Sequence, residues 1–247
     1  MNALHPFTHR EANLRISPSA YDIVTAEVVR LRAELDALIH RFAEFANALA
    51  PLEVPADAPL LARCMADAAR TVGDVGPMAA VAGATAHHAA MAAVRADVAP
   101  VIVDNGGDLC VFTRSPIHVG LYAGRHSPVG DQLALRIPGA EEPLCLCSSS
   151  SRMGHSTSFG DCDLALVIAN DGALADAAAT SAANQVRAGQ DLQPTLARIA
   201  AIPGVHGLLL ARDDRIGIKG NAMPELVRNR DPHLRLRVTT APTVNPS

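Results

Sequence analysis

The residue types most able to do chemistry lie in the stretch 148–180. It opens with four consecutive serines, passes through Gly154-His155-Ser156, and ends where Asp176 and Thr180 stand four residues apart. Side chains at that spacing share one face of a helix. A carboxylate and a hydroxyl placed in this way could bind a hard cation such as Mg²⁺, with backbone carbonyls and waters as further ligands. The alternative is that Asp176 complements the dipole of its own helix while Thr180 bonds back to the helix backbone.

A second candidate is Asn105-Gly106-Gly107-Asp108, which follows the apolar run VIVD. Two glycines at the end of a strand let the backbone approach a ligand closely and present N–H groups to an anion. Asp108 adds a carboxylate beside them. Asn-Gly is also a strong hairpin signal, so a plain turn is the alternative interpretation.

His155 stands between glycine and small hydroxyl residues, which favours an accessible imidazole next to groups able to bind phosphate or ribose. A Ser/His hydrolase is disfavoured because the sequence has no G-x-S-x-G elbow. A polar loop capped by the histidine is the alternative. His87 and His88 are adjacent, so they point in different directions on a helix, and we interpret them as ordinary core or surface histidines.

These residues must be positioned by a mixed set of elements. Apolar spacing predicts helices over 21–49, 59–72 and 78–95, then over 172–188 and 193–202. From Pro100 onward, β-type runs separated by Gly and Pro turns predict strands: VIVDNGG, DLCVFTR, HVGLYAG, QLALRIP, LCLC, LALVIAN, GVHGLLLAR and RIGIKG. This order predicts a single layered α+β domain over 1–247. Residues 1–16 are expected to form an N-terminal arm with a short strand at 13–16, and 224–247 a partly ordered tail.

Composition narrows the classes of function. The 247 residues are 49% hydrophobic but only 3% aromatic, and the net charge is −4 with no basic block, which excludes an obvious nucleic-acid or membrane-surface footprint. The five cysteines are irregularly spaced, which argues against a disulfide framework. Without a signal core or a bilayer-length apolar run, we expect a cytoplasmic protein. Its expected partner is a small-molecule ligand, and its flat helical faces are compatible with a homodimer.

Taken in order, four stretches resemble an uncharacterised prokaryotic branch of the ApbE-like (FAD:protein FMN transferase-related) superfamily. They are VGPMAAVAGA at 75–84, VDNGGD at 103–108, GHS with SFG at 154–160, and ADAAAT at 175–180. The resemblance covers roughly residues 13–238. It implies an ApbE-like fold, an α+β architecture related to the T-fold, with a ligand cleft between its two halves.

The better-known ApbE branch consists of Mg²⁺-dependent flavin transferases, which bind FAD and attach FMN to a Thr or Ser of a target protein. By resemblance, Asp176 and Thr180 match the metal-binding pair, and Ala79 lies in the segment that contributes a backbone ligand. His155 and Asp176 are then the catalytic candidates. The residues expected to contact the cofactor, FAD or FMN, are Asn105, Gly106, Gly107, Asp108, Ser150, Ser151, Arg152, Gly154 and Ser156.

The chain departs from these patterns in its residues at two places, and its loop between His155 and Asp176 is shorter than in the transferases. The lysine expected near the alanine-rich segment is replaced by Ala80 or Val81, and Ser-Ser-Gly-Thr is here Ser149-Ser150-Ser151-Arg152. Arg152 adds a fork that could bind phosphate or carboxylate. Two functions therefore stay open. One is a flavin- or nucleotide-binding transferase or hydrolase with Mg²⁺-dependent chemistry on a phosphate linkage. The alternative is a non-transferase that binds or makes a pterin-type one-carbon cofactor.

Overall fold

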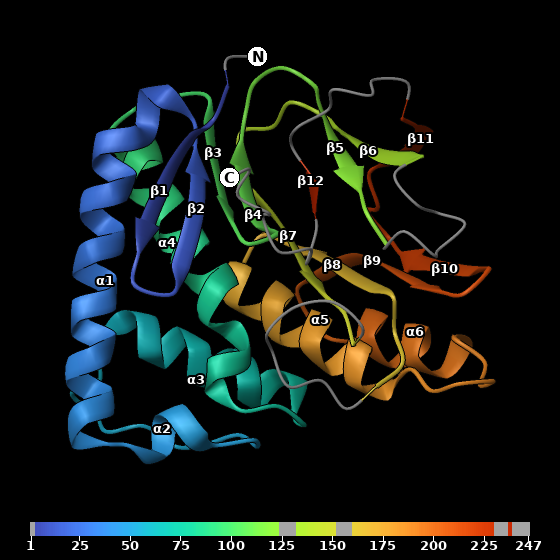
Figure 1. Ribbon diagram of the computed structural model, residues 1–247, viewed down its shortest axis with the longest axis horizontal. Coiled ribbons are helices and arrows are strands. Elements are labelled where there is room, and N and C mark those ends of the chain that lie inside the picture. The colour runs from blue at the N-terminus through green and yellow to red at the C-terminus, as the bar shows by residue number, and fades with distance from the viewer. Residues whose placement is uncertain (1–2, 124–131, 152–159, 230–236, 239–247) are drawn as a thin grey trace, which may run out of the picture.

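Two sheets and a layer of helices make up the structure, which is a computed structural model of the chain (Figure 1). It describes residues 3–123, 132–151, 160–229 and 237–238. In these residues the larger sheet has the order β1-β2-β3-β4-β7-β8-β9-β10, and the smaller has the order β11-β6-β5-β12. All strand pairs are antiparallel except β12 with β5. Arg152, Gly154, His155 and Ser156 lie outside the described residues.

The strands are short, and those of the larger sheet lie side by side in chain order, with longer segments of chain inserted between β2 and β3, β4 and β7, and β8 and β9. The larger sheet contains β1 (His5–His9), β2 (Ala12–Ile16), β3 (Val101–Asn105), β4 (Asp108–Phe112), β7 (Leu144–Ser149), β8 (Leu164–Ala169), β9 (Val205–Arg212) and β10 (Arg215–Gly220). The smaller sheet contains β5 (Ile117–Leu121), β6 (Leu133–Ile137), β11 (Glu225–Arg228) and β12 (Arg237–Val238).

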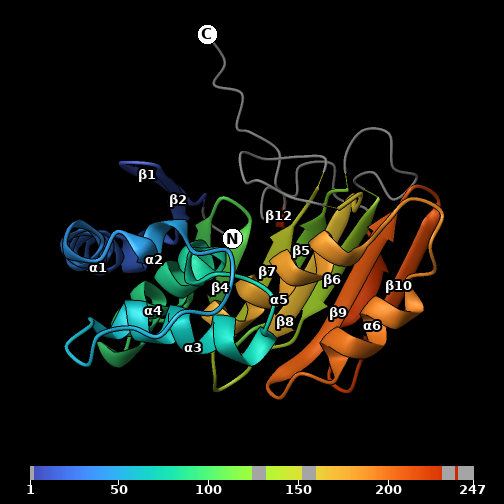
Figure 2. The ribbon, with the colours of Figure 1, turned by 90° about the horizontal axis from the view of Figure 1, so that it is seen from below.

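The helices gather on one face of the larger sheet, as Figures 1 and 2 show. They are α1 (Tyr21–Arg41), α2 (Glu44–Asn47), α3 (Leu60–Val72), α4 (Val81–Arg95), α5 (Gly172–Gln185) and α6 (Gln193–Ala200), with 3-10 turns at Pro18–Ala20 and Pro77–Ala80. None of the helices within the described ranges combines the length and apolar character needed to cross a bilayer.

Strand β8 shows why its sequence, LALVIA, is apolar without interruption. Ala165 and Val167 join the core cluster under the helices, whereas Leu164 and Leu166 join the cluster shared with the smaller sheet. A strand covered on both faces has no polar side. The helices and the smaller sheet therefore enclose the larger sheet between them, and the α+β prediction is confirmed.

Two segments differ from the expected boundaries. The helix predicted over 21–49 is wrong in its second half, because α1 ends at Arg41 and Phe42 has the non-helical angles φ −142 and ψ 69. The chain turns there, and Phe45 of the short helix α2 is fully buried in the core. Residues 1–16, expected as an arm with a strand at 13–16, contain the hairpin of β1 and β2.

Helices α4 and α5 touch backbone to backbone at one glycine from each. An added Cβ at Gly83 would lie 2.3 Å from the carbonyl oxygen of Gly172, and one at Gly172 would lie 2.3 Å from the carbonyl oxygen of Gly83. The Cβ at Gly83 would also lie 2.9 Å from Cys147 Sγ in the sheet below. The crossing of the two helices therefore depends on the absence of both side chains.

We expect Gly83→Ala to lower the free energy of unfolding by about 1–3 kcal/mol, because the methyl group would force α4 and α5 apart. Urea denaturation of the purified protein measures this. The matched control is Ala92→Gly on the same helix, which should cost only about 1 kcal/mol through helix propensity. A Gly83→Ala protein as stable as the wild type would show that the helices are not in contact at this point.

Candidate functional site

The segment Asn105-Gly106-Gly107-Asp108 forms the two-residue turn between β3 and β4. Asn105 and Asp108 face each other across the hairpin, and the glycines have φ angles of 68 and 109. Left-handed backbone at both central residues is the geometry that favours glycine, so the turn interpretation explains the two glycines. Asn105 Nδ2 donates to the carbonyl of Ala82 at 3.1 Å. This bond ties the turn to the start of α4.

Asp108 points to the helix-covered face of the sheet and joins the turn to the serine run. The backbone N–H of Ser148 donates to Asp108 Oδ1 at 3.1 Å, and the Ser148 hydroxyl donates to the Gly107 carbonyl at 3.4 Å. The thiol of Cys147, which donates to the Gly172 carbonyl, lies close enough to Asp108 to lower its pKa. Two of the stretches singled out in the sequence, the glycine turn and the start of the serine run, are therefore in direct contact.

Asp176 approaches the same place from α5. The backbone N–H of Gly83 donates to Asp176 Oδ2 at 2.8 Å. The backbone N–H of Ala82 also lies close enough to lower the pKa of this carboxylate. The N-cap residue of α4, Ala80, makes no side-chain cap. Asp176 therefore caps the N-terminus of α4, where a carboxylate meets the positive end of the helix dipole.

The N-terminus of α5, the helix that carries Asp176, is capped by Asp171. Asp171 Oδ1 accepts hydrogen bonds from the backbone N–H groups of Ala173 at 2.8 Å and Leu174 at 3.3 Å. The alternative interpretation of Asp176, that it serves the dipole of its own helix, is therefore not the arrangement found. The carboxylate is instead directed across the helix interface toward α4.

Asp108 and Asp176 are both buried, each with only 7% of its surface exposed. Burial raises the pKa of Asp176 to about 7, although the hydrogen bonds from Gly83 and Ala82 oppose the shift. Burial also raises the pKa of Asp108 well above its ordinary value, and the nearby charge of Asp176 raises it further. Two carboxylates in this position repel each other when both are ionised. A divalent cation between them would remove that repulsion.

The other predicted metal ligands lie on α5 or in a segment that packs against it. Thr180 is half-buried one turn further along α5, and its hydroxyl makes no hydrogen bond within the part of the chain that the structure describes. Ala79 is half-buried in the 3-10 turn Pro77–Ala80, which packs against α5. The predicted back-bond from Thr180 into its own helix is absent from the described contacts.

The described residues contain no group of three or more His, Cys, Asp or Glu side chains arranged to hold a metal ion. Mg²⁺ does not require such a cage, because it is commonly held by one or two carboxylates together with substrate phosphates and water. Asp108 and Asp176, with the hydroxyl of Thr180 and a backbone carbonyl, are a donor set that fits that chemistry. They do not fit a structural zinc site, which needs four close protein ligands.

The hydroxyls of Ser150 and Ser151 are directed to backbone carbonyls. Ser150 donates to Cys162 at 3.3 Å, and Ser151 donates to Ala183 of α5 at 3.1 Å. These bonds hold the end of the serine run against α5. The predicted cofactor contacts of both serines stay predictions.

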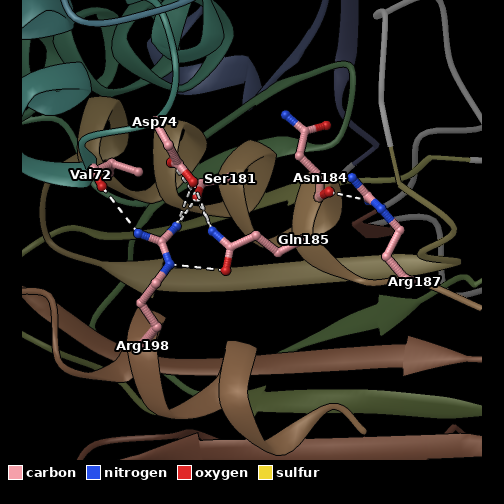
Figure 3. Close-up of polar contacts among 7 residues, drawn as sticks. All are labelled: Val72, Asp74, Ser181, Asn184, Gln185, Arg187 and Arg198. Carbon is pink, nitrogen blue, oxygen red and sulfur yellow. Dashed lines mark hydrogen bonds and ion pairs between the residues drawn. The ribbon is translucent and has the colours of Figure 1, made fainter. Parts of the chain in front are cut away.

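A polar network fixes the far end of α5 (Figure 3). Arg198 of α6 donates to Asp74 Oδ2 at 2.9 Å, to the Val72 carbonyl at 3.3 Å and to Gln185 Oε1 at 2.9 Å. Ser181 and Gln185 of α5 donate to the same carboxylate at 2.6 and 2.8 Å. Arg187 in turn donates to the Asn184 carbonyl. The network connects α5 to the end of α3 and to α6, which limits movement of the helix that carries Asp176.

His87 has a role that sequence reasoning missed. Its Nδ1 accepts a hydrogen bond from the backbone N–H of Gly172 at 3.3 Å, so this nitrogen carries no proton. Burial lowers the pKa of His87, which keeps the ring neutral. The two helices thus cap each other, since α4 supplies His87 to α5 and α5 supplies Asp176 to α4. An aspartate directly before a helix is a sequence signal for an N-cap, so the role of Asp171 could be predicted. No such signal exists for His87.

Comparison with known proteins gives a consistent family and fold. Residues 4–202 match the family model described as AbpE bacteria. A UPF0280 protein of Methanocella arvoryzae is 41% identical over 201 residues, covering 81% of this chain and 80% of its own length. A UPF0280 protein of Methanocaldococcus jannaschii is 34% identical over 221 residues, covering 87% and 88%.

Solved structures show the same fold at low sequence identity. The apo form of flavinyl transferase ApbE from Pseudomonas stutzeri aligns with a TM-score of 0.58 at 12% identity, over 88% of this chain and 94% of its own. A mutant of the flavin transferase ApbE from Vibrio cholerae aligns with a TM-score of 0.56 at 10% identity, over 88% and 96%. The predicted ApbE-like fold is therefore confirmed, whereas its relation to the T-fold stays a prediction.

The raised pKa of Asp176 predicts a pH dependence of stability. In the unfolded chain this carboxyl ionises near its ordinary value of about 4. Since its pKa in the folded protein is about 7, the folded state binds the extra proton between these values. The free energy of unfolding contributed by Asp176 therefore falls as the pH rises from about 4 to about 7.

Asp176→Asn cannot titrate, so the difference in unfolding free energy between the wild type and this variant should change over that interval. We expect a change of about 1 kcal/mol or more, since one pKa unit corresponds to about 1.4 kcal/mol. Urea denaturation at a series of pH values measures it. All other titrating groups are present in both proteins, and Asp108 is the one whose pKa the charge of Asp176 raises. A difference that stays constant with pH would contradict the raised pKa.

Proposed function

We propose that this chain, which belongs to the family described as AbpE bacteria, binds a flavin nucleotide such as FAD together with Mg²⁺ and acts on its phosphate linkage. The observation that carries the proposal is the pair of buried carboxylates, Asp108 and Asp176, directly beside the glycine turn. The likeness to solved flavin transferases concerns the fold, and it supports this choice of ligand over other nucleotides.

In this proposal the protein supplies ligands and backbone donors. Asp176, the Thr180 hydroxyl and the Ala79 carbonyl would hold Mg²⁺, and Asp108 would add a second carboxylate. When bound, the cation would neutralise charge on the phosphates as their linkage breaks. The backbone at Gly106, which has open space around its Cα, lets the ligand approach the turn.

Asp176 is positioned by the chain before any ligand arrives. The N–H of Gly83 holds Oδ2 of this carboxylate, and we propose that Oδ1 binds the cation. Because the carboxylate pair is buried, its interaction with a cation is stronger than it would be in water. His155, Arg152, Gly154 and Ser156 stay predictions for the catalytic base and the phosphate contacts, since they lie outside the described residues.

The direct test is FAD binding to the purified protein with and without Mg²⁺, followed by flavin fluorescence and by the melting temperature. We expect saturable binding that requires Mg²⁺. Asp176→Asn should weaken it by about tenfold or more, equivalent to about 1.4 kcal/mol, because a charged ligand of the cation is lost. The control is Asp67→Asn, which changes an exposed carboxylate paired with Arg70 on α3 and should bind as the wild type does.

Two results would contradict the proposal. One is FAD binding that is indifferent to both Mg²⁺ and Asp176. The other is a wild-type protein that ignores FAD and FMN but binds a reduced or oxidised pterin, which would favour the one-carbon alternative.

A further inference from the structure

A buried carboxylate, that of Asp104, holds the glycine turn from the face of the sheet opposite Asp108. Asp104 precedes the turn in β3 and is 1% exposed, and its Oδ1 accepts a hydrogen bond from the backbone N–H of Gly107 at 3.0 Å. Successive strand residues point to opposite faces, so Asp104 lies on the face away from Asn105 and Asp108. The turn is therefore fixed from both sides of the sheet.

The second oxygen of Asp104 is occupied by an arginine from the N-terminal hairpin. Arg15 Nε donates to Asp104 Oδ2 at 2.7 Å, and Nη2 of the same guanidinium binds that oxygen too. The two residues are directly opposite in the pairing of β2 with β3. Burial raises the pKa of Asp104, and the charge of Arg15 opposes that shift. Arg15 thus favours the ionised form of the carboxylate, which is the stronger acceptor for Gly107.

This arrangement exceeds what the hairpin needs. Two glycines after an asparagine adopt the tight turn without help. An ion pair with one buried and one partly exposed partner, like Asp104 with Arg15, adds little net stability. What the Asp104 carboxylate does add is a fixed orientation of the Gly107 peptide, next to the carbonyl that accepts from Ser148.

We propose that Asp104 is a positioning residue that sets the ligand affinity of the glycine turn, and that Arg15 makes the N-terminal hairpin part of the binding site. The inference rests on the proposed function for the identity of the ligand. Asp104 does not touch the ligand. It acts by holding the Gly107 N–H toward its own carboxylate, so that the backbone of the turn is already in its binding geometry when the nucleotide arrives.

The experiment compares Asp104→Ala, Asp104→Asn and Arg15→Met with the wild type. Three quantities are measured for each: the dissociation constant for FAD with Mg²⁺, the hydrogen-exchange rate of the Gly107 amide, and the melting temperature. The matched control is Arg30→Met, which removes another forked arginine–carboxylate pair, that with Glu27 on α1. It should leave both the affinity and the Gly107 exchange unchanged.

We expect Asp104→Ala to weaken FAD binding by about tenfold and to speed exchange at Gly107, with Arg15→Met intermediate. Asp104→Asn keeps an acceptor for Gly107 and should recover part of the affinity, which a merely structural loss would not do. If Asp104→Ala does not fold, Asp104→Asn replaces it in the comparison. If the wild type binds FAD and Asp104→Ala binds it equally tightly, the positioning role of Asp104 is wrong and the proposed function still stands.

Absence of FAD binding by the wild type would overturn the proposed function instead. Gly107 exchange then decides about Asp104 by itself. Faster exchange in Asp104→Ala but not in Arg30→Met supports the positioning role, and equal exchange in all proteins overturns it.

Discussion

The close contact of α4 with α5 at Gly83 and Gly172 is the constraint on which the site depends. Because neither residue has a side chain, the helices approach until the N–H of Gly83 reaches Asp176 and the N–H of Gly172 reaches His87. Each helix then caps the other. A bulkier residue at either position would withdraw Asp176 from the sheet, and with it from Asp108 and the glycine turn. The packing of α4 against α5 therefore determines where the Asp176 carboxylate lies in the site.

That contact brings unfavourable electrostatics with it. Asp108 and Asp176 are placed together away from solvent, where burial raises the pKa of each. Such an arrangement is costly in a protein that binds nothing, since two apolar residues would fill the same space. It is useful in one that binds a cation and the phosphates associated with it. Asp104 and Arg15 on the opposite face show the same pattern of buried charge around one short turn.

Much of this could be predicted from the sequence, and the omissions have a common cause. The glycine turn, the uninterrupted strand LALVIA and the alanine-rich helix each carry a local signal, and the structure contains all three. The end of α1 at Arg41 was missed because the apolar spacing continues to Phe45, although the chain turns between them. The direction of the Asp176 side chain, the acceptor role of His87 and the pairing of Arg15 with Asp104 depend on contacts between distant segments. Single-sequence periodicity does not contain those contacts.

The claim that Asp108 and Asp176 form a buried, cation-binding pair is tested most directly by carboxyl-carbon NMR of ¹³C-labelled protein, with Asp176 assigned through Asp176→Asn. In the free protein, the Asp176 signal should titrate with a pKa of about 7. Addition of Mg²⁺ and FAD should move that pKa down by at least about one unit, because a bound cation favours the ionised form. A pKa near the ordinary value of about 4 in the free protein, or one that Mg²⁺ and FAD leave unchanged, would contradict the account.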